Sequence, residues 1–268
     1  MDSPLFRLRN SNRVWARGEA SGARGGGVLD LKTMSGAITR YLQTTRNPWV
    51  AFILVFPVYF FYQLGLALTP GIRNGADLIT DALLLLRHWE PKALAVVAAV
   101  LVLAYGLVLA RLKRDRKFSG ALFGLVAVEG AVHGVLMFVL VNRILGALLL
   151  GQGPDTNYPF FIDVILSLGA GFHEELVFRV LLFGGLLWVG SRAGRKPSVP
   201  VLVMAMVVSS LLFSGIHYVG PLGDPLQLGS FLFRFLAGCY FAAVYHWRGF
   251  AVAVYAHAIY DIGIFAVT

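Results

Sequence analysis

The chain has 268 residues, of which 57% are hydrophobic and only 14% are charged, and its mean hydropathy is +0.72. This composition lies far outside that of soluble globular domains and predicts an all-α integral membrane protein. The single cysteine, Cys239, excludes an internal disulfide.

The first 33 residues are basic and rich in Arg, Gly and Ser, which predicts a disordered tail. They lack the apolar core of a cleavable signal peptide. An interfacial segment is expected at residues 35–46, and we hypothesise that translation begins at Met34. Residues 34–158 are then expected to hold the N-terminal transmembrane helices.

Seven apolar runs are long enough to cross a bilayer core about 30 Å thick. They cover residues 48–69, 91–112, 119–141, 160–189, 199–218, 226–247 and 250–267. A shorter apolar run at residues 77–86 predicts a re-entrant or interfacial helix, or an eighth, tilted span. We therefore expect a bundle of about seven, or eight, transmembrane helices.

Basic residues gather in the N-terminal segment and in the loops after the second and fourth runs, whereas the alternate loops are more acidic. The positive-inside rule then places the amino terminus in the cytoplasm and the carboxyl terminus outside. This asymmetry, with attraction to anionic lipid, accounts for the net charge of +9. We expect a multi-pass protein of the plasma membrane or inner membrane, with the lipid bilayer and no nucleic acid as a partner.

The most unusual stretch is residues 173–179, His-Glu-Glu-Leu-Val-Phe-Arg, inside the apolar run 160–189. A charge at the centre of a membrane helix costs about 2.5 to 3.5 kcal/mol, and here three charges share one helix. Glu175 and Arg179 are four apart and can form an ion pair, whereas Glu174 points about 100° away. One arginine cannot neutralise two adjacent carboxylates, so we interpret the stretch as a functional site.

Two further polar pairs lie in later runs, Phe213-x-x-x-His217 in the fifth and His257-x-x-x-Asp261 in the seventh. Glutamate and histidine from separate helices can hold a water between a general base and polarising groups, which favours hydrolysis. The same side chains are ordinary zinc ligands. A divalent metal such as zinc on Glu174, His217 and His257, as in a metalloprotease, and a site without a cofactor both fit these residues.

The motifs EExxxR, FxxxH and HxxxD, in this order and on separate membrane helices, resemble those of the CPBP intramembrane proteases. This family contains CAAX prenyl endopeptidases and bacteriocin-processing or immunity proteins. The resemblance implies a catalytic core at residues 159–268, with Glu175 and Arg179 as a buried supporting pair. It also implies an endopeptidase that hydrolyses a peptide bond of a membrane-associated or exported protein.

The same resemblance implies that Glu174 is the base that activates water and that His217 helps to hold this water. His257 and Asp261 occupy the places of the pair that stabilises the oxyanion. Prenyl endopeptidases of the eukaryotic and archaeal type carry Asn at the place of Asp261, and an ionised aspartate cannot donate a hydrogen bond. We therefore expect Asp261 to orient His257, to ligate a metal or to work protonated, and a prenylated substrate is less favoured.

Signatures of other membrane proteases are incomplete. The zinc motif HExxH fails at Val177, and the aspartyl motif GxGD fails at Leu222. Ser214 and His217 lack the GxSG motif of a serine protease. A non-catalytic alternative stays open, either a membrane immunity scaffold or a transporter that uses the same carboxylates as a relay. The oligomeric state is open as well.

Other polar residues in the apolar runs are interpreted as structural. Glu129 and His133 are expected to make interhelical polar contacts, beside glycines at 120, 124, 130 and 134 that predict close helix packing. His173 is expected to form a hydrogen bond within the bundle. Arg234 and Asp163 could pair with each other or with the site.

Overall fold

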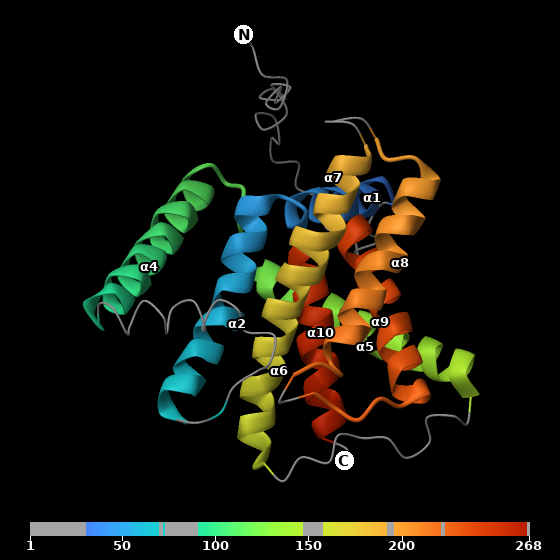
Figure 1. Cartoon of the computed structure of the whole chain (residues 1–268). Coiled ribbons are helices and arrows are strands. Elements are labelled where there is room, and N and C mark those ends of the chain that lie inside the picture. Colours follow the sequence, from blue (N-terminus) through green and yellow to red (C-terminus); the bar gives the residue numbers. More distant parts are fainter. Residues whose placement is uncertain are drawn as a thin grey trace. The chain divides into compact units, whose positions relative to one another are not determined.

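The computed structural model describes residues 31–69, 72, 91–146, 158–191, 196–220 and 223–266, and these ranges are mainly helical (Figure 1). Residues 39–268 form one compact unit, and the described part of the other unit is the start of one helix, residues 31–38. Most of the predicted disordered tail and the helix predicted at residues 77–86 lie outside the described residues.

The first half of the described chain contains the helices α1 (Leu31–Thr45), α2 (Pro48–Leu68), α4 (Pro91–Arg114) and α5 (Ala121–Leu145). Helix α1 begins at Leu31, so its first three residues lie within the predicted disordered tail, residues 1–33. The start of α2 is set by Asn47, whose side chain accepts hydrogen bonds from the backbone N–H groups of Trp49 at 2.9 Å and Val50 at 3.3 Å. Pro48 occupies the first helical position, where no N–H is needed.

The apolar run 160–189 is one continuous helical rod of three segments, α6 (Phe160–Glu174), the π-helix η3 (Glu175–Phe183) and α7 (Gly184–Gly190). Three helices follow, α8 (Val199–Ile216), α9 (Leu228–Arg248) and α10 (Phe250–Phe265). Gly249 separates α9 from α10 at a φ of 91°, a conformation that L side chains rarely adopt. The chain therefore reverses at once, and α10 returns beside α9 and α6 (Figure 1).

Five helices in the described ranges are long and apolar enough to cross a membrane: Pro48–Leu68, Val96–Arg114, Ala121–Leu145, Val199–Ile216 and Leu228–Arg248. The predicted all-α membrane bundle is confirmed, but two predicted spans differ from the expectation. The fourth is divided by the π-helix. The seventh, α10, has only 16 residues, which rise about 24 Å, so it is shorter than the bilayer core.

Helix α10 packs against α2, α5, α6 and α9, and small residues permit this close approach. A Cβ at Gly130 of α5 would lie 2.7 Å from Cβ of Tyr255, and one at Gly171 of α6 would lie 2.7 Å from Cβ of Ala258. The packing predicted for the glycines at 130 and 134 is confirmed. The prediction for 120 and 124 is wrong, because a Cβ at either position would meet no atom within 4 Å.

Candidate active site

The charged cluster spans the junction of two segments, with Glu174 at the end of α6 and with Glu175 and Arg179 in the π-helix η3, where backbone hydrogen bonds join residues five apart. Gly184 ends this segment. Its N–H donates to the carbonyl of Arg179, and a Cβ at Gly184 would lie 3.3 Å from that oxygen. Such segments are rare and occur frequently at functional sites. The sequence pattern, interpreted as an ordinary helix, did not predict this widening.

Glu175 and Arg179 form the ion pair expected from their spacing. Oε2 of Glu175 lies 3.2 Å from Nε of Arg179, and the two side chains are 0% and 1% exposed. The guanidinium lies over the Phe213 ring, 4.3 Å from its centroid, and its Nη2 donates to the Gly238 carbonyl at 3.4 Å. These contacts offset the cost of removing the arginine from water.

Glu175 has a second partner that the sequence did not predict. Its Oε1 accepts a hydrogen bond from Nδ1 of His257 at 2.8 Å, and since a carboxylate only accepts, the network assigns a proton to Nδ1. Nε2 of His257 lies 3.5 Å from Oδ2 of Asp261 and 3.6 Å from Oε2 of Glu174. The imidazole is stacked on Phe241, with ring centroids 4.7 Å apart. Glu175 therefore orients His257 from within the protein interior.

His217 forms the C-cap of α8. Its Nδ1 donates to the Phe213 carbonyl at 2.8 Å, so its Nε2 faces Oε2 of Glu174 at 3.9 Å. Phe213 thus has two roles, because its carbonyl orients His217 and its ring covers the Arg179 guanidinium. This double role gives the FxxxH motif a physical explanation.

The structure brings the four predicted catalytic residues together from three helices. The Glu174 and His257 side chains are only 8% and 6% exposed, whereas Asp261 and His217 are 21% and 24% exposed. The cluster is therefore buried at Glu174 and reaches the surface at His217 and Asp261. A buried carboxylate between two imidazoles, with one open side, can activate a water molecule.

Residues 156–263 contain all of these side chains and match a family model described as type II CAAX prenyl endopeptidase Rce1-like. This match supports the assignment of this part of the chain to the CPBP family of CAAX-type proteases. The family indicates intramembrane endopeptidase activity of the CAAX type, a peptide substrate and a multi-pass membrane protein. No curated protein and no solved structure matches the chain.

The predicted metal centre is not supported in this CPBP site. Among the described residues, no group of three or more His, Cys, Asp or Glu side chains is arranged to hold a metal ion. A metalloprotease site with Glu174, His217 and His257 as metal ligands therefore finds no support in the described residues.

Other polar residues of the CPBP region lie outside the cluster. Nδ1 of His173 is 2.8 Å from the Gly169 carbonyl, so the predicted hydrogen bond within the bundle is confirmed. Arg234 pairs with Asp224, with Nη2 and Oδ2 2.5 Å apart. Asp163 is 4% exposed, and its Oδ1 accepts no hydrogen bond from the described residues.

A second polar cluster joins α1, α5 and α9. Glu129 accepts hydrogen bonds from the Tyr41 hydroxyl and from Nε and Nη2 of Arg248, the latter at 2.8 Å. Burial and the neighbouring carboxylate raise the pKa of Tyr41. Nδ1 of His133 lies 2.9 Å from the Tyr240 hydroxyl. Glu129 and His133 therefore make interhelical contacts, as predicted.

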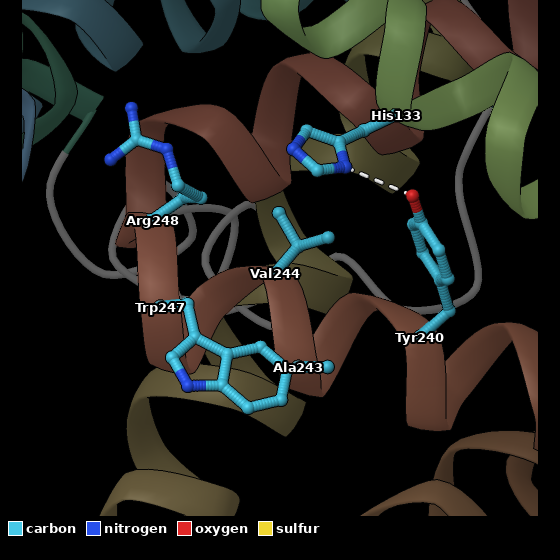
Figure 2. Close-up of a pocket in the computed structure, with 6 residues that line it drawn as sticks. All are labelled: His133, Tyr240, Ala243, Val244, Trp247 and Arg248. Atoms are coloured by element: carbon cyan, nitrogen blue, oxygen red, sulfur yellow. Dashed lines mark hydrogen bonds between the residues drawn. The ribbon is translucent and has the colours of Figure 1, made fainter. Parts of the chain in front are cut away.

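A cavity of about 280 Å³ adjoins this second cluster, and none of the predicted catalytic residues lines it. Figure 2 shows its lining residues, His133, Tyr240, Ala243, Val244, Trp247 and Arg248. The Arg248 guanidinium points away from the cavity in this view. The sequence did not reveal Tyr41 and Arg248 as partners of Glu129. The sequence signal that could have drawn attention to Arg248 is its position at the end of an apolar run, where a cationic side chain can reach the membrane surface.

Proposed function

We propose that the protein is an intramembrane endopeptidase in which Glu174 is the general base. The difference between two adjacent carboxylates carries this proposal. Oε1 of Glu175 accepts a hydrogen bond from His257 at 2.8 Å, and Oε2 forms an ion pair with Nε of Arg179 at 3.2 Å that lacks hydrogen-bond geometry. Among the described residues, the ion-pair contacts of Glu174 are those with the two imidazoles, at 3.6 and 3.9 Å, which is longer than a hydrogen bond. Its lone pairs are therefore available to a water molecule.

The water is held between Glu174 and His217. The separation of 3.9 Å between Oε2 and Nε2 is too long for a direct hydrogen bond but suits a water that contacts both. Glu174 takes one proton from this water while the water oxygen attacks the carbonyl carbon of the scissile peptide bond. The unprotonated Nε2 of His217 accepts the other hydrogen in a hydrogen bond. The proton on Glu174 then passes to the leaving amine as the C–N bond breaks.

His257 stabilises the negative charge on the carbonyl oxygen. As an imidazolium it donates Nδ1–H to Glu175 and Nε2–H to the oxyanion. Asp261, whose Oδ2 lies 3.5 Å from Nε2, offsets the positive charge of this imidazolium. This role needs no proton on Asp261 and explains how aspartate can stand where the prenyl-specific enzymes carry asparagine.

The substrate that we propose is a membrane-associated or exported protein, cleaved in or near the bilayer of the plasma membrane or inner membrane. With the amino terminus in the cytoplasm, α8 runs outward, so His217 and the open side of the cluster lie toward the outer leaflet. This orientation suits the processing of exported proteins better than the processing of cytosolic ones.

The variant Glu174→Gln tests the base. Proteome-wide mapping of protein termini would compare a deletion strain complemented with wild type, with Glu174→Gln and with the surface-loop control Asp115→Asn. We expect cleavage to fall by about 10² to 10⁴-fold in Glu174→Gln and to persist in the control. Glu174 forms no hydrogen bond to another described side chain, so its neutral isostere should fold. Normal processing by Glu174→Gln would refute the mechanism and favour a non-catalytic scaffold or transporter.

A further inference from the structure

The segment that follows His217 is held to the first half of α9. The backbone N–H of Asp224 donates to the carbonyl of His217 at 2.8 Å. The carboxylate of the same Asp224 contacts Nη2 of Arg234 at 2.5 Å. The catalytic histidine is therefore joined to α9 through one aspartate, which uses its backbone on one side and its side chain on the other.

Neighbouring contacts hold Arg234 and the end of α8 in the same place. The Arg234 guanidinium lies over the Tyr218 ring, 5.2 Å from its centroid, and the Tyr218 hydroxyl donates to Oγ of Ser230 at 2.9 Å. One turn before His217, Oγ of Ser214 donates to the Phe231 carbonyl at 2.8 Å. The residues before and after His217 are thus attached to consecutive turns of α9.

His217 needs such a support because of where it lies. As the C-cap of α8 it follows the last helical residue, and helix ends fray more readily than helix interiors. Its ring is 24% exposed, and one hydrogen bond, to the Phe213 carbonyl, orients it. A misplacement of about 1 Å in a catalytic group can lower the rate by about 10²-fold. The water site at 3.9 Å from Glu174 therefore depends on the segment after His217.

The Arg234 guanidinium is held mainly by Asp224. Its Nη2 lies 2.5 Å from Oδ2 of Asp224, whereas its Nη1 is buried and has no hydrogen-bond acceptor among the described residues. The pair of Arg234 and Asp224 thus joins the helix end that carries His217 to α9.

We propose that Asp224 and Arg234 are positioning residues that hold the His217 imidazole in its place opposite Glu174. This inference rests on the proposed role of His217 in holding the catalytic water. It assigns a task to the segment around Asp224, which none of the three family motifs covers. Neither residue touches the reacting atoms. Their loss should lower kcat more than it changes KM.

The test uses Arg234→Gln, Asp224→Asn and the double variant in the full-length protein, with Arg143→Gln as the control. Arg143 is an exposed arginine near the end of α5, so the control removes the same charge elsewhere. The substrate is a synthetic peptide spanning a cleavage site that wild-type cells process and Glu174→Gln cells do not. Each single variant should lower kcat about 10- to 100-fold, with KM changed less than about twofold and the control unchanged.

The double variant examines whether the two residues act as one unit. If they do, its kcat falls no further than that of either single variant, because either change already breaks the link. Multiplicative losses would overturn the linkage, and unchanged kcat in both single variants would overturn the inference as a whole. The Asp224 side chain is 53% exposed and that of Arg234 is 25% exposed. A partly exposed ion pair contributes little to stability, so all variants should unfold near the wild-type temperature.

A substrate-free measurement separates this inference from the proposed function. Modification of His217 by diethyl pyrocarbonate, followed peptide by peptide with mass spectrometry, reports how firmly the imidazole is held. The rate should rise at least about threefold in both single variants, while His246, near the other end of α9, reacts as in the wild type. Equal His217 rates in all variants would refute positioning even if the peptidase is active. Faster modification without any peptidase activity would refute the proposed function alone.

Discussion

Replacing Glu175 by glutamine removes its charge but leaves an amide oxygen that can still accept the hydrogen bond from His257. Arg179, which is 1% exposed, then keeps its charge in the interior without a carboxylate. Breaking a buried ion pair from one side costs about 3 to 5 kcal/mol. Since the Phe213 ring and the Gly238 carbonyl still contact the guanidinium, we expect the lower end, about 3 kcal/mol. In a protein of this size that lowers Tm by about 6 to 12 °C.

The same substitution should also slow catalysis. A hydrogen bond to a charged acceptor contributes about 1 to 2 kcal/mol more than one to a neutral acceptor. Glu175 orients His257 through one such bond of 2.8 Å, so we expect kcat to fall about 5- to 30-fold. This loss is smaller than that of Glu174→Gln, because the general base is still present.

Thermal unfolding of the purified protein in detergent, combined with peptide cleavage, would measure both effects. In the double variant Glu175→Gln/Arg179→Met neither charge remains, so most of the stability should return while kcat stays low. The loop variant Asp115→Asn should change the free energy of unfolding by less than about 0.5 kcal/mol. An unchanged Tm in Glu175→Gln, or a double variant as unstable as the single one, would refute the reasoning.

Two further predictions concern packing and orientation. Gly130→Ala should destabilise the protein by about 1 to 3 kcal/mol, because the new Cβ would lie 2.7 Å from Cβ of Tyr255 on α10. The control Gly124→Ala should be neutral or slightly stabilising, because its Cβ would meet no atom of the described residues within 4 Å. Equal effects of the two variants on thermal unfolding would contradict this prediction. In a Cys239→Ala background, Tyr218→Cys should react with an impermeant maleimide added outside the cell, and labelling only from the cytoplasm would overturn the proposed topology.

Interactions between residues close together in the chain made much of the architecture predictable from the sequence. Apolar runs of bilayer length had to be helical, since backbone N–H and C=O groups in lipid must satisfy one another within the segment. The motif spacing was also informative because residues four apart share a helix face, which anticipated the pair of Glu175 and Arg179. The glycines at 130 and 134 are also four apart, so they share one helix face and predicted the close packing of that face against a neighbouring helix.

Contacts between segments far apart in the chain depended on the tertiary structure. The sequence could not reveal that Glu175 also orients His257, 82 residues later, or that Tyr41 and Arg248 meet at Glu129. The π-helix was equally hidden, because its i, i+5 bonding follows from how the rod packs and not from a residue pattern. Thus the sequence determined which side chains face a common interior. Packing of α10 against α5 and α6 decided that Glu175 contacts His257 and Arg179 while Glu174 forms no hydrogen bond to another described side chain, because these contacts depend on distances between helices.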